Sequence, residues 1–351
     1  MIQKHKYLTL DAIRGVAAIF VLTRHAGELL GGWQFLHSYL AVDLFFVMSG
    51  FVISVAYDEG LSSKKLSVIE FLKIRTIRLY PLYFLALMFS ILLTVHYAIH
   101  HNDAFNWTGL SVQILLGLIL IPSPFPGTGL FPLNGPSWSI FFEVIANALY
   151  AKFKFHLTKK VLLSVMVVSA LMLTICVLMK HNMDFGFNWK NGIGGFPRVM
   201  YSFWGGVLIY QIRKKLQFGK IFNPWISLLM LLIVMLLLSM PVKVYTEIYD
   251  LMVVLIVFPI LVLFSTYIEP TRNTTLEKIY SVLGMTSYAI YIFQAPFVWA
   301  YSGIFMKHGF TSMLSGIIAV FVLFSLSLLL DFFYDQPIRR WLRNKFLVAT
   351  K

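Results

Sequence analysis

The sequence has 351 residues, of which 59% are hydrophobic and only 13% are charged, and its mean hydropathy is +0.78. A soluble domain carries about 25% charged residues, so the composition excludes an ordinary soluble protein and indicates a helical membrane protein. The formal net charge of +14 does not indicate nucleic-acid binding, because the Lys and Arg residues cluster between apolar segments, as in cytoplasmic loops.

Apolar segments of membrane-spanning length recur along the whole chain, which we interpret as a single membrane-embedded domain covering residues 1–351. The single cysteine, Cys176, excludes an internal disulfide and a cysteine-based metal site. No internal repeat is evident. We predict an all-α fold of about ten spans, at 10–30, 38–57, 80–99, 137–151, 161–179, 199–212, 223–241, 249–268, 284–304 and 313–334.

A further apolar segment, 108–122, is assigned from the charges of the loops around it. If it crossed the membrane, the lysines between residues 152 and 160 would lie outside. If it is re-entrant or interfacial, every loop rich in Lys and Arg lies in the cytoplasm. We therefore expect 108–122 not to cross, and both termini, beginning with Lys4 and Lys6, to be cytoplasmic.

The first span carries two ionisable residues, Arg14 and His25, which are costly inside a membrane and usually mark function. They lie on one helix face about 16 Å apart along the axis, His25 toward the outer side. The topology brings Asp43 and Glu143 to the depth of His25. An imidazole oriented by a carboxylate can act as a general base, so His25, Asp43 and Glu143 are candidate catalytic residues. A buried histidine bonded to the helix backbone is the structural alternative.

Two further arginines, Arg75 and Arg78, lie in an amphipathic stretch that we expect to end at Pro81, on the same side as Arg14. Paired guanidinium groups suit phosphate recognition, because each offers a planar fork of donors. Loop charge and lipid headgroup contact are the structural alternatives. For Arg14, an ion pair with Asp11 is another.

Small residues in the second span, Ser49 and Gly50, are interpreted as helix packing rather than as a nucleophile site. The chain has no GxSxG elbow, no P-loop, no GxGxxG and no paired metal-ligand spacing. No metal site is therefore predicted.

Four blocks follow one another along the chain: Arg14 and His25 with ten residues between them, DLFFVMSGF (43–51), FLKIRTIRLYP (71–81) and SWSIFFE (137–143). In this order they resemble the membrane acyltransferase 3 family of bacterial sugar O-acyltransferases, in its stand-alone form. Weaker similar stretches follow, FPRVMYSFWGGVLIY (196–210), SYAIYIFQAP (287–296) and YDQPIRRWL (334–342). The chain departs from the family at Gln294, where many relatives have His, and at Asp335, where they often have Glu.

The resemblance implies a multi-pass protein of the bacterial cytoplasmic (inner) membrane, in contact with its lipids and with no permanently bound cofactor. It implies acetyl-CoA or another acyl-CoA as the cytoplasmic donor, and a hydroxyl of a cell-surface glycan or lipid-linked sugar as the acceptor. On this basis we expect Arg14, Arg75 and Arg78 to bind the donor and His25 to act as base with Asp43 or Glu143. Candidates for the acceptor or oxyanion side are Ser137, Trp138, Ser139 and Arg198. For Arg198, contact with an anionic glycan and anchoring at the lipid headgroups are the two alternatives.

Two other functions remain open at this stage. Intramembrane His, Arg and carboxylates also build proton relays, so a proton-coupled transporter or acyl-group translocator is one alternative, which the absence of an internal repeat weakly disfavours. A non-catalytic membrane partner of a polysaccharide synthase is the other.

Overall fold

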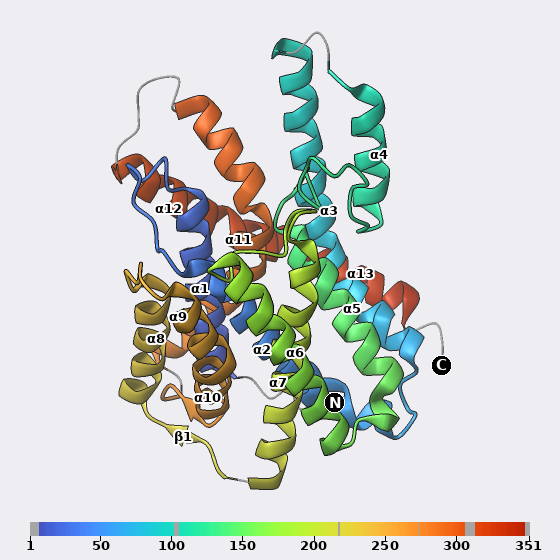
Figure 1. Ribbon diagram of the computed structural model, residues 1–351, viewed down its shortest axis with the longest axis vertical. Helices are drawn as coiled ribbons and strands as arrows, with labels where there is room; N and C mark the ends of the chain where they lie inside the picture. The colour runs from blue at the N-terminus through green and yellow to red at the C-terminus, as the bar shows by residue number, and fades with distance from the viewer. Residues whose placement is uncertain (1–6, 102–104, 217, 273, 306–312, 348–351) are drawn as a thin grey trace.

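The computed structural model describes residues 7–101, 105–216, 218–272, 274–305 and 313–347, which form an almost entirely helical bundle (Figure 1). Lys4 and Lys6 lie outside the described residues. The two short strands β1 (Ile221–Phe222) and β2 (Ile268–Glu269) pair in parallel. The helices are α1 (Leu8–His25), α2 (Ala41–Ser62), α3 (Val68–His101), α4 (Trp107–Leu118), α5 (Ser137–Phe153), α6 (Lys159–Lys180), α7 (Gly195–Leu216), α8 (Pro224–Ser239), α9 (Thr246–Met252), α10 (Phe258–Ser265), α11 (Thr275–Phe305), α12 (Met313–Leu330) and α13 (Gln336–Phe346).

The bundle is that of a membrane protein with several spans. Within the described ranges, six helical segments are long and apolar enough to cross a membrane: Ser38–Ser62, Val68–His100, Lys159–Lys180, Thr246–Ser265, Thr275–Ile304 and Met313–Phe346. The larger number of about ten spans stays a prediction. Of the remaining predicted spans, α5 and α8 have 17 and 16 residues, and α1 and α7 carry several charged side chains.

Helix α4 covers most of the segment that we expected not to cross. Its 12 residues span about 18 Å, well short of the ~30 Å hydrocarbon core. It lies beside the upper part of α3 in Figure 1, and two tyrosines of α3 tie down its end. Tyr80 donates to the Leu118 carbonyl at 2.8 Å, and Tyr83 donates to the Gly117 carbonyl. A re-entrant or interfacial helix has this form.

We expected the stretch that carries Arg75 and Arg78 to end at Pro81, and this expectation is wrong. Helix α3 continues through the proline to His101. Proline at position 81 leaves the Ile77 carbonyl without its usual helical donor. Around this turn, Tyr288 donates to the Leu79 carbonyl at 2.8 Å and Tyr334 to the Pro81 carbonyl at 3.3 Å, which ties the helix to its neighbours on both sides of the proline. Both arginines are therefore fixed on the same rigid helix as the span that follows them.

Two helix pairs in the bundle pack backbone against backbone at glycines. In the α2–α7 pair, a Cβ added to Gly50 would lie 1.9 Å from the Phe203 carbonyl oxygen, and one added to Gly206 would lie 2.0 Å from the Val47 oxygen. In the α1–α11 pair, a Cβ on Gly15 would lie 2.5 Å from the carbonyl oxygen of Leu283. Gly50 is thus a packing residue, as the sequence indicated.

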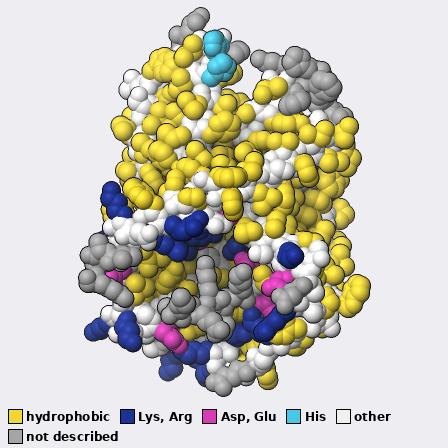
Figure 2. All heavy atoms as spheres, turned by 180° about the vertical axis from the view of Figure 1, so that it is seen from behind, with side chains coloured by type: hydrophobic (Ala, Val, Ile, Leu, Met, Phe, Trp, Pro, Cys, Tyr) yellow, Lys and Arg dark blue, Asp and Glu magenta, His cyan; other side chains and the backbone are white. Residues whose placement is uncertain are grey.

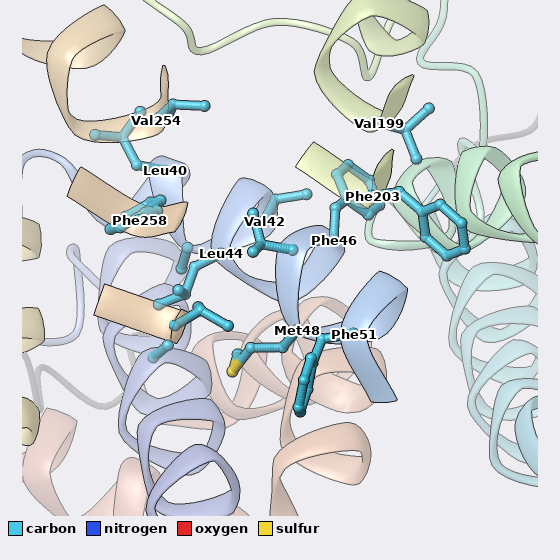
Figure 3. Packing of buried hydrophobic residues seen from close by; sticks show 14 of the residues in the cluster. Leu40, Val42, Leu44, Phe46, Met48, Phe51, Val199, Phe203, Val254 and Phe258 are labelled. Atoms are coloured by element: carbon cyan, nitrogen blue, oxygen red, sulfur yellow. The ribbon is translucent and has the colours of Figure 1, made fainter. Parts of the chain in front are cut away.

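Side chains of α2 fill the spaces on either side of it. Phe46 packs toward Phe203 of α7, while Leu40 lies near Val254 and Phe258 (Figure 3). The Phe51 ring points away from Phe203 and meets the ring of Tyr7 edge-on, with 5.0 Å between the ring centres. On the face seen from behind the view of Figure 1, hydrophobic and basic side chains occupy different regions. Hydrophobic side chains cover its upper part, and Lys and Arg gather in the lower part (Figure 2).

Candidate active site

A cavity of about 180 Å³ opens between α1, α2, α3, α5 and α11. It brings together five of the residues singled out in the sequence, the three predicted donor arginines and two residues of α5. Its polar lining consists of Arg14, Ser49, Arg75, Arg78, Ser139, Glu143, Ser287, Tyr288 and Tyr291.

The central interaction of this cavity joins α3, α5 and α2. Glu143 Oε1 accepts hydrogen bonds from Arg75 Nη2 at 2.9 Å and from Ser49 Oγ at 2.5 Å. The side chains of Arg75 and Glu143 are 15% and 19% exposed. The Nε–H of Arg75 has no hydrogen-bond partner among the described residues. This guanidinium is therefore oriented by the protein without being saturated by it.

The other two arginines are also held by acidic side chains. Arg14 donates from Nη2 to Asp11 Oδ1 at 2.9 Å and from Nε to Ser287 Oγ at 2.9 Å. The ion pair with Asp11, expected as a structural alternative, is therefore present. Arg78 Nη1 lies 3.6 Å from Asp335 Oδ2, and its guanidinium lies 5.9 Å from the centre of the Tyr288 ring. All three cations are positioned before any ligand binds.

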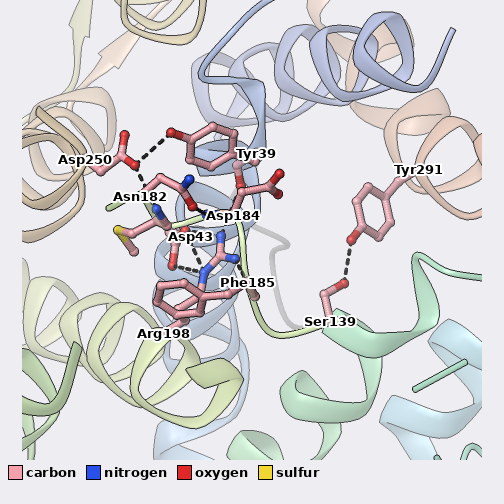
Figure 4. Close-up of polar contacts among 10 residues, drawn as sticks. Tyr39, Asp43, Ser139, Asn182, Asp184, Phe185, Arg198, Asp250 and Tyr291 are labelled. Atoms are coloured by element: carbon pink, nitrogen blue, oxygen red, sulfur yellow. Dashed lines mark hydrogen bonds and ion pairs between the residues drawn. The ribbon is translucent and has the colours of Figure 1, made fainter. Parts of the chain in front are cut away.

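A hydroxyl pair lies between α5 and α11 in the lining of the same cavity. Ser139 Oγ and Tyr291 Oη are 2.7 Å apart (Figure 4). The Ser139 hydroxyl also donates to the Pro136 carbonyl at 3.1 Å. Tyr291 is therefore the donor within the pair, and either hydroxyl can donate to an oxygen that develops negative charge by turning from its present acceptor.

Asp43 and Arg198 differ from the expectation. Arg198 Nη2 and Nε donate to Asp43 at 2.6 and 3.2 Å, and its remaining donors bond to the carbonyls of Phe185 and Tyr39 (Figure 4). The two side chains are 1% and 0% exposed. Asp43 is therefore paired with Arg198 instead of orienting His25. Arg198 is buried, so it meets neither a glycan nor the lipid headgroups.

His25 is the last residue of α1 and is exposed. Its neighbour Arg24 bonds to Asp184 Oδ2 at 2.6 Å. In the described part of the chain, His25 has no hydrogen bond or ion pair with Asp43 or Glu143, and it does not line the cavity around Arg75. Glu143 pairs with Arg75 instead. The expected pairing of His25 with a carboxylate of α2 or α5 is thus not present in this structure.

The first residues of α5 point to three different environments, because each step along a helix turns by about 100°. Ser137 lines a separate small cavity with Asn134 and Tyr83. Trp138 packs over the Arg198 guanidinium, 5.2 Å from its ring centre. Of the three candidates for the acceptor or oxyanion side in this helix, only Ser139 lines the cavity around Arg75.

Sequence reasoning missed four polar residues of the cavity. Ser49 was interpreted as packing only, yet it bonds to Glu143. Ser287, Tyr288 and Tyr291 belong to a stretch noted only as family-like. The signal was present, since Ser287 and Tyr291 are four residues apart and share one helix face. Gln294, three residues further on, is buried, and its Oε1 has no hydrogen-bond partner among the described residues.

A helical membrane protein with a cavity lined by arginines, carboxylates and hydroxyls defines the class of an intramembrane enzyme or transporter, and comparison with known proteins decides between them. The sequence profile of the acyltransferase 3 family, described as an acyltransferase domain, matches residues 7–332. The chain belongs to this family, and it is an acyltransferase.

A curated relative matches about half of the chain. "Protein 2 in picA locus" of Rhizobium radiobacter is 39% identical over 180 residues, which cover 48% of this chain and 94% of the relative. No solved structure matches the chain.

Proposed function

We propose that this protein is an integral membrane O-acyltransferase with about ten spans, both termini in the cytoplasm and the bacterial inner membrane as its location. It transfers an acyl group, acetyl in the simplest case, from cytoplasmic acyl-CoA to a hydroxyl of a cell-surface polysaccharide or lipid-linked sugar. Family membership favours a transferase over the transporter and over the non-catalytic partner. The observation that carries the proposal is the cavity in which Arg14, Arg75 and Arg78 converge with Ser139 and Glu143.

In the proposed reaction the donor enters from the side of the arginines. Arg14, Arg75 and Arg78 attract and orient its polar parts, and Glu143 and Asp335 hold the guanidinium groups in place. The thioester lies toward Ser139 and Tyr291, whose hydroxyls donate to the carbonyl oxygen as it becomes an oxyanion. Glu143 is therefore a positioning residue for Arg75 in this mechanism.

The acyl transfer itself needs a base on the acceptor side. His25 takes the proton from the acceptor hydroxyl as that oxygen attacks the thioester carbonyl. The tetrahedral intermediate then breaks its carbon–sulfur bond, and the thiolate leaves and is protonated to CoA. About 16 Å along α1 separates Arg14 from His25, a distance that the extended donor arm must bridge. Direct transfer is preferred here to an acyl-enzyme on His25.

The test is turnover by the purified protein, with release of free CoA as the readout and mass analysis of the acylated acceptor. We expect His25→Ala to lower kcat by about 10²-fold or more, the size of a lost general base. His156→Ala, at another exposed histidine, is the matched control and should leave kcat unchanged. A His25→Ala variant with normal turnover would exclude His25 as the base.

A further inference from the structure

A second and larger cavity, of about 540 Å³, adjoins the cavity around Arg75 and shares Arg14, Met48, Val52 and Arg78 with it. Its volume is in the range of ligand pockets in proteins. Its lining comes from α1 near its start, from α2 and α3, from α11 around Gly284, from the turn at Asp331 and from α13. Its charged lining consists of Asp11, Arg14, Arg78, Asp331, Arg339, Arg340 and Arg343.

Three of the five arginines in this larger cavity already have acidic partners. Asp11 pairs with Arg14 and Asp335 with Arg78. Arg339 Nη2 lies 2.7 Å from Asp335 Oδ2 and 3.5 Å from Asp331 Oδ1. These carboxylates offset the positive charge of the inner wall, so a bound anion gains less from it.

The two arginines further along α13, Arg340 and Arg343, differ from these three. Among the residues that the structure describes, neither forms an ion pair with an aspartate or glutamate, and both are exposed. The Nε–H of Arg340 donates to the Gln336 carbonyl at 3.4 Å, which leaves its terminal donors available. Spaced three residues apart, the two guanidinium groups lie on neighbouring positions of one helix face. They give the exposed part of the cavity lining an excess of positive charge and two planar forks of donors.

The fold holds these two side chains at a fixed place. Helix α13 continues from α12 through the π-helical turn Asp331–Asp335 and packs against α3. The ion pairs of Asp335 with Arg78 of α3 and with Arg339 of α13 tie the two helices together. Arg340 and Arg343 are thus presented by a helix anchored to the wall of the smaller cavity, and not by a free tail.

We propose that the larger cavity binds the nucleotide end of acyl-CoA and that Arg340 and Arg343 bind its 3′-phosphate. This inference rests on the proposed donor and assigns its subsites. The bulky phosphorylated nucleotide fits the wide basic cavity, and the narrow pantetheine arm passes Arg14 and Arg78 into the smaller one. The planar fork of an arginine can bind two phosphate oxygens at once. An arginine without a carboxylate partner does not have to break an ion pair before it binds the phosphate.

The experiment compares two donors, acetyl-CoA and acetyl-3′-dephospho-CoA, with the purified full-length protein. Wild type should have the lower KM for acetyl-CoA. The double variant Arg340→Gln/Arg343→Gln should raise the KM for acetyl-CoA by on the order of tenfold or more, with kcat unchanged and the KM for the dephospho donor unchanged. An equal rise for both donors, or no rise, overturns the subsite.

A matched control on the same helix is Lys345→Gln. Its ammonium lies 5.0 Å from the centre of the Trp341 ring, and Lys345 does not line the cavity. The Lys345→Gln substitution removes one positive charge from α13 and should leave the preference for the donor with the 3′-phosphate intact. The same assay in nanodiscs with and without anionic lipid distinguishes binding of the donor's 3′-phosphate from binding of a lipid phosphate. A double variant that loses only a dependence on anionic lipid, and keeps its donor preference, overturns the proposal.

A binding measurement separates this proposal from the proposed activity. Calorimetric titration with adenosine 3′,5′-bisphosphate should show binding to wild type and loss of binding in the double variant, whether or not any acyl group is transferred. Absent binding to wild type, or equal binding to both proteins, refutes the subsite. Absent turnover of every acyl-CoA by a protein that binds the bisphosphate refutes the proposed function alone.

Discussion

Two arginine–carboxylate pairs in the same bundle have opposite surroundings. Arg75 and Glu143 line a cavity and are 15% and 19% exposed, whereas Arg198 and Asp43 are 1% and 0% exposed. Arg198 has each of its three nitrogens bonded to protein oxygens, while Arg75 keeps an Nε–H without a partner in the described part of the chain. The same chemistry therefore makes an adaptable site in one place and a closed structural anchor in the other.

The closed pair belongs to a wider polar network. Tyr39 donates to Asp250 Oδ2 at 2.8 Å, and the same oxygen accepts from the Met183 backbone N–H at 2.9 Å (Figure 4). Arg198 extends the network by donating a hydrogen bond to the Phe185 carbonyl. The network thus joins α2, α7 and α9 to the segment between α6 and α7, which also carries the Asp184 that pairs with Arg24 beside His25. Through Asp184 and Arg24 this segment also contacts the end of α1, next to His25.

The largest expected effect comes from breaking the closed pair. Asp43→Asn should lower the free energy of unfolding by about 3–5 kcal/mol, because it leaves the Arg198 charge buried without a counter-charge. Thermal unfolding in detergent measures it. The double variant Asp43→Leu/Arg198→Met, which removes both charges, should recover much of the loss. An Asp43→Asn protein that melts like wild type would show that the pair is not an anchor.

Breaking the open pair should affect activity more than stability. Glu143→Gln should lower kcat/KM by about 10²-fold, mainly by raising the donor KM, because Arg75 loses the charge that orients it. The double variant with Arg75→Gln should lose little more, since the two residues act as one unit. Asp58→Asn, which alters an ion pair with Lys154 outside the cavity, is the control with normal kinetics. Additive losses would argue against a shared role.

The smallest effect sharpens the contrast through pH. Burial is the main cause that lowers the pKa of His37, beside the closed network; the nearby charge of Arg24 lowers it further, and the bond to the Met240 carbonyl partly opposes this. The unfolded chain therefore binds a proton at higher pH than the folded one, and stability should fall as pH drops through the ordinary histidine range near 6.5. Melting temperatures at several pH values measure this dependence.

His37→Gln is the variant that isolates this contribution. It should flatten the pH dependence of stability in that range, because it removes the titrating group beside Asp250. Among the described residues, no histidine lines the cavity around Arg75. The pair of Arg75 and Glu143 therefore has no neighbouring histidine in this cavity through which its stability could depend on pH. A pH dependence that His37→Gln leaves unchanged would assign it to another group.

The grouping of the three donor arginines could be predicted from the sequence, whereas the partners of the carboxylates could not: Glu143, expected at the depth of His25, pairs with Arg75. Loop charges placed Arg14, Arg75 and Arg78 at one level, and the structure brings them to one cavity. Asp43 was expected near His25 because both lie near helix ends. Asp43 instead shares a stripe with Val47 and Gly50, the face of α2 that packs on α7. A single sequence does not show that this stripe is buried against α7, and this burial is the reason that Asp43 pairs with Arg198.

The glycine contacts within the α1–α11 and α2–α7 pairs have a consequence for how the protein can move. Backbones that touch directly have no layer of side chains between them to compress or reorder, so each pair behaves as one stiff body. The cavity around Arg75 takes walls from both pairs, Arg14 and Tyr291 from one and Ser49 from the other. Widening it to admit a donor or release a product therefore means that one pair rocks against the other, while the spacing inside each pair stays constant through the cycle.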